Sequence, residues 1–174
     1  MATAVTLRTA TAADIAGVDA LLARAYPRLL KADYPPSLLV TAIPRIARAQ
    51  PALVASGTYH VATDEDGTIL AAGGWTRAAP GGGQTTPTTG HIRHVVTDDR
   101  QTRRGIGRAL LTRVIAEAAA QGMTRLDCLS TLTAVPFYRA LGFGGDRPVT
   151  IALGAGIDFP AVAMTRALQA AGSV

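Results

Sequence analysis

The chain has 174 residues, of which 48% are hydrophobic and 17% charged, a balance that supports a folded core and excludes wholesale disorder. Its net charge of +5 comes almost entirely from arginine, because Lys31 is the only lysine. No apolar run is long enough to span a bilayer, and Met1 to Asp14 lack the basic start and apolar centre of a signal peptide. We therefore expect a single domain, residues 1–174, that is soluble, cytoplasmic and not bound to a membrane.

The first half of the chain predicts a strand, two helices and a pair of strands. Residues 5–9 alternate between apolar and polar types, as a half-buried strand does. A helix follows, because Thr11 and Asp14 have the spacing of a capping box. Pro44 lies inside a second helical segment and is expected to kink or divide it. The remaining elements are strands at 58–63 and 69–77, a turn at 64–67 and a glycine-rich mobile loop at 79–90.

The second half predicts a further alternation of strands and helices. Gly122 and Gly142 stand where the two helices of this half end, as glycine commonly does. The elements are a strand at 91–97, a helix from 105 to about 121, a strand at 126–129, a helix at 133–141, and strands at 149–153 and 161–165. The resulting order, β-α-α-β-β-β-α-β-α-β-β, predicts a mixed α/β sandwich.

The clearest functional pattern is the segment 95–111, VVTDDRQTRRGIGRALL. It predicts a strand, an arginine-rich loop, and then a helix opened by Gly105 and Gly107. Backbone N–H groups at the positive end of a helix, surrounded by guanidinium groups, form a phosphate site. A P-loop would need Gly-Lys-Ser/Thr, and a dinucleotide fingerprint would need a third glycine where Leu110 stands. A tight glycine turn beside a solvated arginine face is the purely structural alternative.

Two other classes of ligand are disfavoured by composition and spacing. The arginines cluster at one loop and aromatic residues make up only 5%, which argues against a nucleic-acid partner. Cys128 is the only cysteine, which excludes an internal disulfide and a multi-cysteine metal site. His91 and His94 are three apart on a predicted strand, so their rings point to opposite faces and cannot share an ion. We expect no metal.

Two segments together resemble a known family. Residues 102–111, TRRGIGRALL, resemble the acyl-CoA pyrophosphate signature Q/R-x-x-G-x-G/A of the GNAT superfamily of N-acyltransferases. Residues 134–143, AVPFYRALGF, are similar to its second signature, a helix ending in F-Y-x-x-L-G-F. The spacing of the two signatures and the order of elements also agree, so the resemblance covers nearly the whole chain. It implies a mixed α/β fold, with a mostly antiparallel sheet flanked by helices, and N-acyltransferase activity with acetyl-CoA as donor.

The resemblance also implies how the coenzyme is held. Backbone amides of residues 103–108 would bind the pyrophosphate, and Val95 and Thr97 would bind the pantetheine arm as if it were another strand. Thr102 departs from the family pattern, which has Gln or Arg there, and neighbouring arginines can compensate through charge-assisted contacts. The full implied coenzyme site is Val95, Val96, Thr97, Thr102, Arg103, Arg104, Gly105, Ile106, Gly107 and Arg108.

Transfer of an acyl group to an amine needs a neutral amine, a stabilised oxyanion and a donor for the departing thiolate. Tyr138 is the candidate acid, because a phenol with a pKa of about 10 keeps its proton at neutral pH. It lies about 100° around its helix from the core-facing Phe137. His91 is the candidate base, since it shares strand parity with Val95 and Thr97 and falls where some relatives place a glutamate. A structural hydrogen bond for His91, with the amine binding in its neutral form, is an equal alternative.

The acceptor is expected to be a small primary amine, with Tyr34 and Trp75 as walls of its pocket and Asp33 nearby. Trp75 as a core residue and Asp33 as a helix-end charge are the structural alternatives, and the loop 81–90 could act as a lid. A peptide N-terminus or lysine is the alternative acceptor, and a non-catalytic acyl-CoA sensor is the alternative function. A homodimer is compatible with the sequence.

Overall fold

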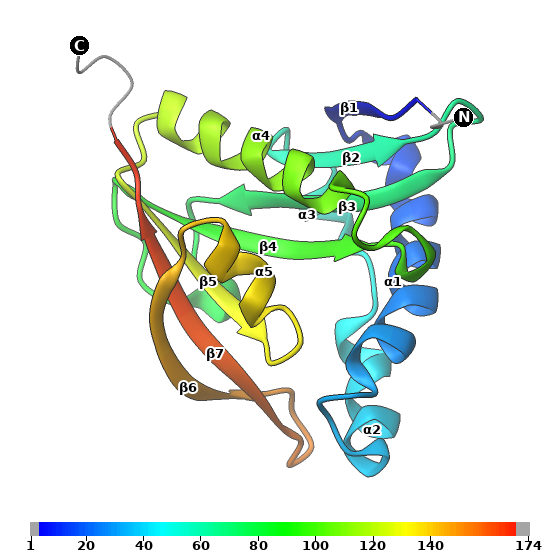
Figure 1. Ribbon diagram of the computed structural model, residues 1–174. Coiled ribbons are helices and arrows are strands. Elements are labelled where there is room, and N and C mark those ends of the chain that lie inside the picture. The colour runs from blue at the N-terminus through cyan, green and yellow to red at the C-terminus, as the bar shows by residue number, and fades with distance from the viewer. Residues whose placement is uncertain (1–3, 170–174) are drawn as a thin grey trace.

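The computed structural model of the protein describes residues 4–169 as a twisted sheet with helices on both faces (Figure 1). The seven strands are β1 (Thr6–Thr9), β2 (Tyr59–Thr63), β3 (Ile69–Thr76), β4 (Thr89–Thr97), β5 (Arg125–Thr131), β6 (Gly144–Ala152) and β7 (Asp158–Ala167). The helices are α1 (Ile15–Leu30), α2 (Pro36–Ile46), α3 (Pro51–Val54), α4 (Ile106–Ala120) and α5 (Val135–Ala140), with short 3-10 turns at Ala12–Asp14, Pro80–Gly82 and Asp99–Gln101. The expected mixed α/β fold is confirmed.

The strands lie in the order β1-β2-β3-β4-β5-β7-β6, and every neighbouring pair is antiparallel except β4 and β5. The parallel pair is short: only Thr89–His91 of β4 are in register with Arg125–Asp127 of β5. Beyond His91 the two strands part, while β5 continues to pair with β7 as far as Thr131. Figure 1 shows β4 and β5 running apart in this way. The sheet therefore opens in its middle.

Alternating side chains of the central strands pack against helices on opposite faces, as the two-residue period of a strand requires. Val61 and Ala72 pack in the cluster that holds the buried side of α1. Their neighbours Ala62 and Ala71 pack against Leu110 of α4. The described residues contain no helix with the length and apolarity needed to cross a membrane.

A β-bulge interrupts β4 immediately after the short parallel segment. Two residues of β4, His94 and Val95, stand opposite the single residue Gly73 of β3. The backbone of His94 has a φ of 46°, and the Tyr59 hydroxyl donates to its carbonyl oxygen at 2.8 Å. A Cβ on Gly73 would lie 2.8 Å from the Val95 side chain, so glycine is needed at that position. A bulge bends its strand and ends regular pairing, which is how β4 leaves β5.

The local predictions hold in most places. Asp14 accepts from the Thr11 amide at 2.8 Å, which confirms the capping box ahead of α1. The turn at 64–67 is present, with the Gly67 amide donating to the Asp64 carbonyl. Pro44 lies inside α2 without dividing it, and the short helix α3 was not expected. Strands β5, β6 and β7 are longer than the segments predicted from their apolar residues, because flanking residues, many of them polar, also pair with the neighbouring strand.

The loop between β4 and α4 is anchored by the carboxylate of Asp98, whose side chain is fully buried. It accepts from Arg24 of α1 at 2.6 Å, and from the side chain and amide of Arg100 at 3.0 Å. Burial alone would raise the pKa of Asp98, but the Arg100 hydrogen bonds and the charges of both arginines outweigh it and hold the pKa below its usual value. This contact joins the first helix to the start of the loop.

Replacing Asp98 with Asn is expected to lower the free energy of unfolding by about 2 kcal/mol at pH 7, because hydrogen bonds to a buried charge are lost. Since the folded-state pKa is depressed, this contribution is complete above the unfolded-state pKa of about 3.9 and is lost as the pH falls through the folded-state value. Urea unfolding at a series of pH values measures both effects. The exposed Asp66, replaced by Asn, is the control, and an equal loss in both variants would contradict this account.

Candidate active site

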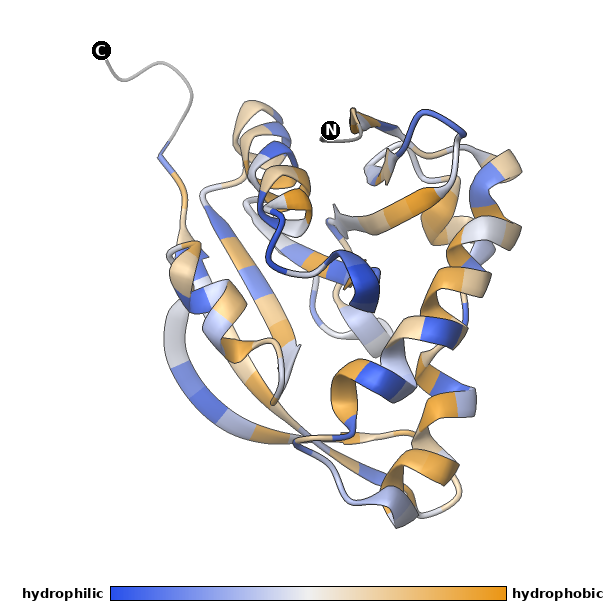
Figure 2. Cartoon of the chain, turned by 45° about the vertical axis from the view of Figure 1, so that its right-hand side comes forward, coloured by the Kyte–Doolittle hydropathy of each residue, from blue (hydrophilic) through white to orange (hydrophobic). Residues whose placement is uncertain are grey.

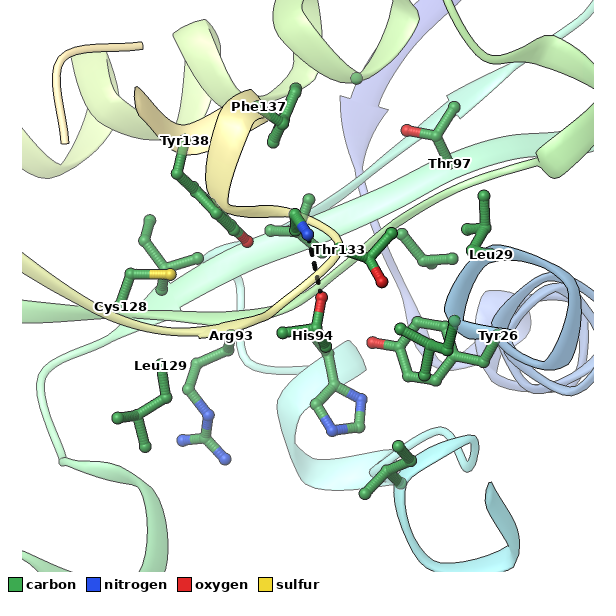
Figure 3. A pocket seen from close by; sticks show the side chains of 18 of the residues that line it. Tyr26, Leu29, Arg93, His94, Thr97, Cys128, Leu129, Thr133, Phe137 and Tyr138 are labelled. Atoms are coloured by element: carbon green, nitrogen blue, oxygen red, sulfur yellow. Dashed lines mark hydrogen bonds between the residues drawn. The ribbon is translucent and has the colours of Figure 1, made fainter. Parts of the chain in front are cut away.

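A cavity of about 1150 Å³ lies where β4 and β5 part. Residues 92–97 of β4 form one side, and Cys128, Leu129 and Thr131 of β5 form the other. Figure 3 shows that α1 contributes Tyr26 and Leu29, while Phe137 and Tyr138 enter from α5. The cavity reaches from the loop before α4 to side chains from α2, β6 and β7. It is much larger than a second cavity of about 310 Å³ between α1 and the turn before β3.

One end of the cavity is the N-terminus of α4. Gly105 takes a left-handed φ of 78° and caps this helix without any side-chain hydrogen bond. The first N–H groups of a helix have no partner inside it, so they are available to a ligand. A Cβ on Gly107 would lie 2.6 Å from the Thr97 side-chain oxygen, which explains the absence of a side chain there. Bare amides at a positive helix end fit an anion.

The predicted coenzyme residues converge on this end of the cavity. Those that line it are Val95, Val96, Thr97, Thr102, Arg103, Gly105, Ile106, Gly107 and Arg108. Arg104 lies in the same loop, with its guanidinium bonded to the side chain of Gln101 rather than turned to the cavity. Figure 2 shows the loop that leads into α4 as a hydrophilic segment. The geometry thus gathers cations and free amides at one place.

Tyr138 occupies the middle of the cavity wall and is 5% exposed. Burial raises the pKa of its phenol well above the usual value, and the neighbouring Cys128, Tyr26 and Tyr59 raise it further. Burial also raises the pKa of the Cys128 thiol, to about 12. Both groups therefore stay protonated at neutral pH, so Tyr138 is a hydrogen-bond donor and Cys128 is a poor nucleophile.

His91 does not line the cavity. The expectation that it shares a face with Val95 and Thr97 is wrong, because the bulge at His94 adds a residue and reverses the alternation. Ile92 and Val95 consequently pack in the same cluster, although their numbers differ by three. The pKa of His91 is lowered chiefly by burial, and its Nε2 atom is buried without a hydrogen-bond partner. This position gives it no access to the cavity.

The two proposed acceptor residues also lie behind the walls rather than on them. Trp75 is 1% exposed in the core, where its indole N–H donates to Glu117 at 3.2 Å. Tyr34 is buried, and its hydroxyl donates to the Pro160 carbonyl at 2.7 Å and accepts from the Leu132 amide at 2.8 Å. Tyr34 therefore joins the end of α1 to β7 and closes the fold beneath the cavity.

Sequence reasoning missed Arg93 and His94, which do line the cavity. The His94 ring accepts from the Gln50 side-chain amide at 3.3 Å if its Nε2 is unprotonated. Arg93 donates to Gln50 at 3.2 Å and to Thr76 at 3.1 Å. A strand bulge has no sequence signature here beyond Gly73, so neither side chain could be placed in advance. Among the described residues that line the cavity, none is Asp or Glu, and no group of three or more potential metal ligands occurs elsewhere in residues 4–169.

Comparisons with known proteins agree with this geometry. The sequence model of the Acetyltransferase (GNAT) family matches residues 22–143. A GCN5-related N-acetyltransferase from Rhodopseudomonas palustris is 20% identical, with a TM-score of 0.74 over 97% of this chain and 99% of that one. The PaiA N-acetyltransferase of Thermoplasma acidophilum, solved with coenzyme A, is 11% identical, with a TM-score of 0.68 over 95% and 99%.

A third solved structure extends the comparison. The ribosomal-protein-S18-alanine N-acetyltransferase of Escherichia coli is 18% identical, with a TM-score of 0.65 over 98% of this chain and 97% of that one. At these identities the structures establish a shared fold. A search of curated proteins gives no significant match.

The surroundings of His94 predict an imidazole that stays neutral in neutral solution. Burial and the charge of Arg93 lower its pKa to about 4. A pH titration of the ring followed by NMR should give a midpoint near that value, and Arg93→Met should raise it because a positive neighbour is removed. A wild-type midpoint near the ordinary value of about 6.5 would contradict the buried placement of the ring.

Proposed function

Because the chain belongs to the Acetyltransferase (GNAT) family, we propose that it transfers the acetyl group of acetyl-CoA directly to a primary amine bound in the same cavity. The observation that carries this proposal is the continuity of the cavity. It runs from the uncapped N-terminus of α4, along the open edge of β4, to the buried phenol of Tyr138. Those three features suit the phosphates, the arm and the sulfur of one extended thioester.

The chain's own residues would position the coenzyme in two ways. Amides of residues 103–108 would hold the pyrophosphate, assisted by the exposed guanidinium groups of Arg103 and Arg108, which line the cavity. Between Ile92 and Thr97, β4 has no neighbouring strand on the side of β5. Val95 and Thr97 in that stretch would pair with the amide groups of the pantetheine arm, as an added strand would.

Tyr138 would donate a hydrogen bond to the sulfur as the carbon–sulfur bond breaks and the carbon–nitrogen bond forms. Its raised pKa makes complete proton transfer to the thiolate unfavourable, since an ordinary thiol has a pKa of about 8.5. A hydrogen bond that strengthens as charge builds on sulfur lowers the barrier without that transfer. The thiol leaves with a proton that originates from the amine.

The described residues that line the cavity offer no carboxylate as a base, and the imidazole of His94 has a lowered pKa. Burial and the nearby charge of Arg93 would instead lower the pKa of a bound ammonium, so that the amine binds in its neutral form. This replaces the base role that sequence reasoning gave to His91. The enzyme would then be more active at alkaline pH, as the neutral fraction of free amine increases.

A small-molecule acceptor is favoured over a peptide. The hydrogen bonds of Tyr34 to Pro160 and Leu132 close the fold between α1 and β7, and the stacked ring of Phe159, at 4.5 Å from that of Tyr34, lines the cavity there. An extended chain would need an open groove at this place. The structural neighbours do not decide the question, because one is named for a ribosomal-protein alanine.

The direct test is release of free thiol from acetyl-CoA in the presence of an amine panel that includes polyamines, aminoglycosides, amino acids and peptides. Turnover with any member supports the proposal. Calorimetric binding of coenzyme A with no turnover across the panel would identify a sensor module instead. Absence of both binding and turnover would contradict the proposal that the cavity binds coenzyme A.

Tyr138→Phe is expected to lower kcat about 10- to 100-fold while leaving the dissociation constant of coenzyme A unchanged, because one hydrogen bond to the developing thiolate is removed. Steady-state kinetics and calorimetry measure the two quantities. Tyr26→Phe is the matched control, since it removes a phenol hydroxyl from the opposite wall of the same cavity. An equal fall in kcat in both variants would contradict a specific role for Tyr138.

A further inference from the structure

The guanidinium of Arg93 has no carboxylate partner among the described residues. It is half-buried on the cavity wall, and its two terminal nitrogens each donate to a neutral oxygen, one on Thr76 and one on Gln50. Burial lowers the pKa of Arg93, which indicates a charge that is incompletely solvated. Charged groups removed from water are stabilised by an opposite charge, and the Arg93 guanidinium, which contacts only neutral oxygens, is available to bind an anion.

Among the described residues, no Asp or Glu lines the cavity wall that carries Arg93, and Asp127, whose charge acts on the neighbouring His91, is paired with Arg125. The other titratable side chains on this part of the wall are His94, whose lowered pKa leaves it neutral, and Arg45 of α2. Arg45 donates to the Leu153 carbonyl at 3.0 Å and adds a second positive charge to the cavity lining. Polyamines and other purely cationic amines would be repelled here.

This positive region is separate from the phosphate end of the cavity. Arg93 lies opposite Gly74 and Thr97 opposite Ala71, which are three residues apart on β3, so roughly 10 Å of strand separates Arg93 from Thr97. The loop that begins α4 lies beyond Thr97 in the same direction. A coenzyme whose phosphates lie at residues 103–108 therefore leaves the Arg93 end of the cavity to the acceptor.

We propose that Arg93 binds the carboxylate of the acceptor, and that the acceptor is an amino acid with an apolar side chain; this rests on the acetyl transfer proposed above. After its bonds to Thr76 and Gln50, each terminal nitrogen of the guanidinium has one N–H left. Two such groups match the two oxygens of a carboxylate. Leu129, Ile46 and Leu153 line the same cavity as Arg93, so the side chain of the acceptor would meet apolar surface.

The test compares acceptors that differ only in the carboxylate: L-leucine with L-leucinamide, and L-phenylalanine with its amide. Thiol release from acetyl-CoA should show kcat/KM about 10- to 100-fold higher for the acids, the range expected for hydrogen bonds between charged groups. The amides have the less basic amines, so they would be preferred if the carboxylate were not recognised. Equal or better use of the amides in both pairs would overturn the proposal.

Arg93→Met should remove the preference by raising KM for the acids more than for the amides, because only the acids lose a carboxylate contact, whereas both lose the effect of the Arg93 charge on the pKa of the bound amine. Arg93→Lys should restore part of it, because a charge remains without the planar fork. Arg147→Met is the matched control, since Arg147 is an exposed residue of β6 outside the cavity lining. A preference that survives in Arg93→Met would contradict the assignment.

A binding measurement separates this proposal from the acetyl transfer on which it rests. With coenzyme A saturating, calorimetry should detect N-acetyl-L-leucine in the wild type but not in Arg93→Met, and should not detect N-acetyl-L-leucinamide in either. That pattern without turnover would support the carboxylate site while removing the catalytic role. If the enzyme acetylates amines but binds N-acetyl-L-leucine and N-acetyl-L-leucinamide equally, the acetyl transfer would stand and the carboxylate site at Arg93 would be contradicted. Unchanged coenzyme A binding in each variant shows that the fold is intact.

Discussion

The backbone bulge at His94 decides where the sheet opens. Regular pairing of β4 with β5 ends at His91, and the extra residue that follows turns β4 away while the Tyr59 hydroxyl holds the bulged carbonyl. A left-handed conformation at a residue other than glycine is costly and persists only where the surrounding contacts require it. The strained backbone at His94 has a structural consequence: one edge of β4, which would otherwise be paired inside the sheet, is exposed.

The cavity formed by that opening has a different chemical environment at each end. At the α4 end, free amides and arginines suit phosphate groups; at the other end, Arg93 and apolar side chains suit a different anion. The buried phenol of Tyr138 lies between them. Because no Asp or Glu is among the described residues of the lining, the cavity favours anionic ligands and the neutral form of an amine. Binding and activation of the acceptor would thus follow from the same charge distribution.

Sequence patterns predicted the order of elements apart from α3, and they singled out the residues that line the α4 end of the cavity, because both depend on local rules. Alternation and capping identify strands and helices, Gly105 marks a left-handed backbone, and Gly107 marks a position with no room for a side chain. The acceptor end was not predictable in this way. Parity along β4 placed His91 beside Val95, and the bulge reversed it. Trp75 reads equally well as a pocket wall and as a core residue, and its bond to Glu117, forty-two positions away, depends on the packed fold.

Hydrogen exchange of backbone amides, with and without saturating coenzyme A, tests most directly whether the open edge of β4 is the binding surface. Exchange should slow in residues 92–97 and 103–108 when the coenzyme is added, while β1, at the far edge of the sheet, should exchange at an unchanged rate. Unchanged exchange in residues 92–97, or protection limited to the outer strands β6 and β7, would contradict binding at the open edge of β4.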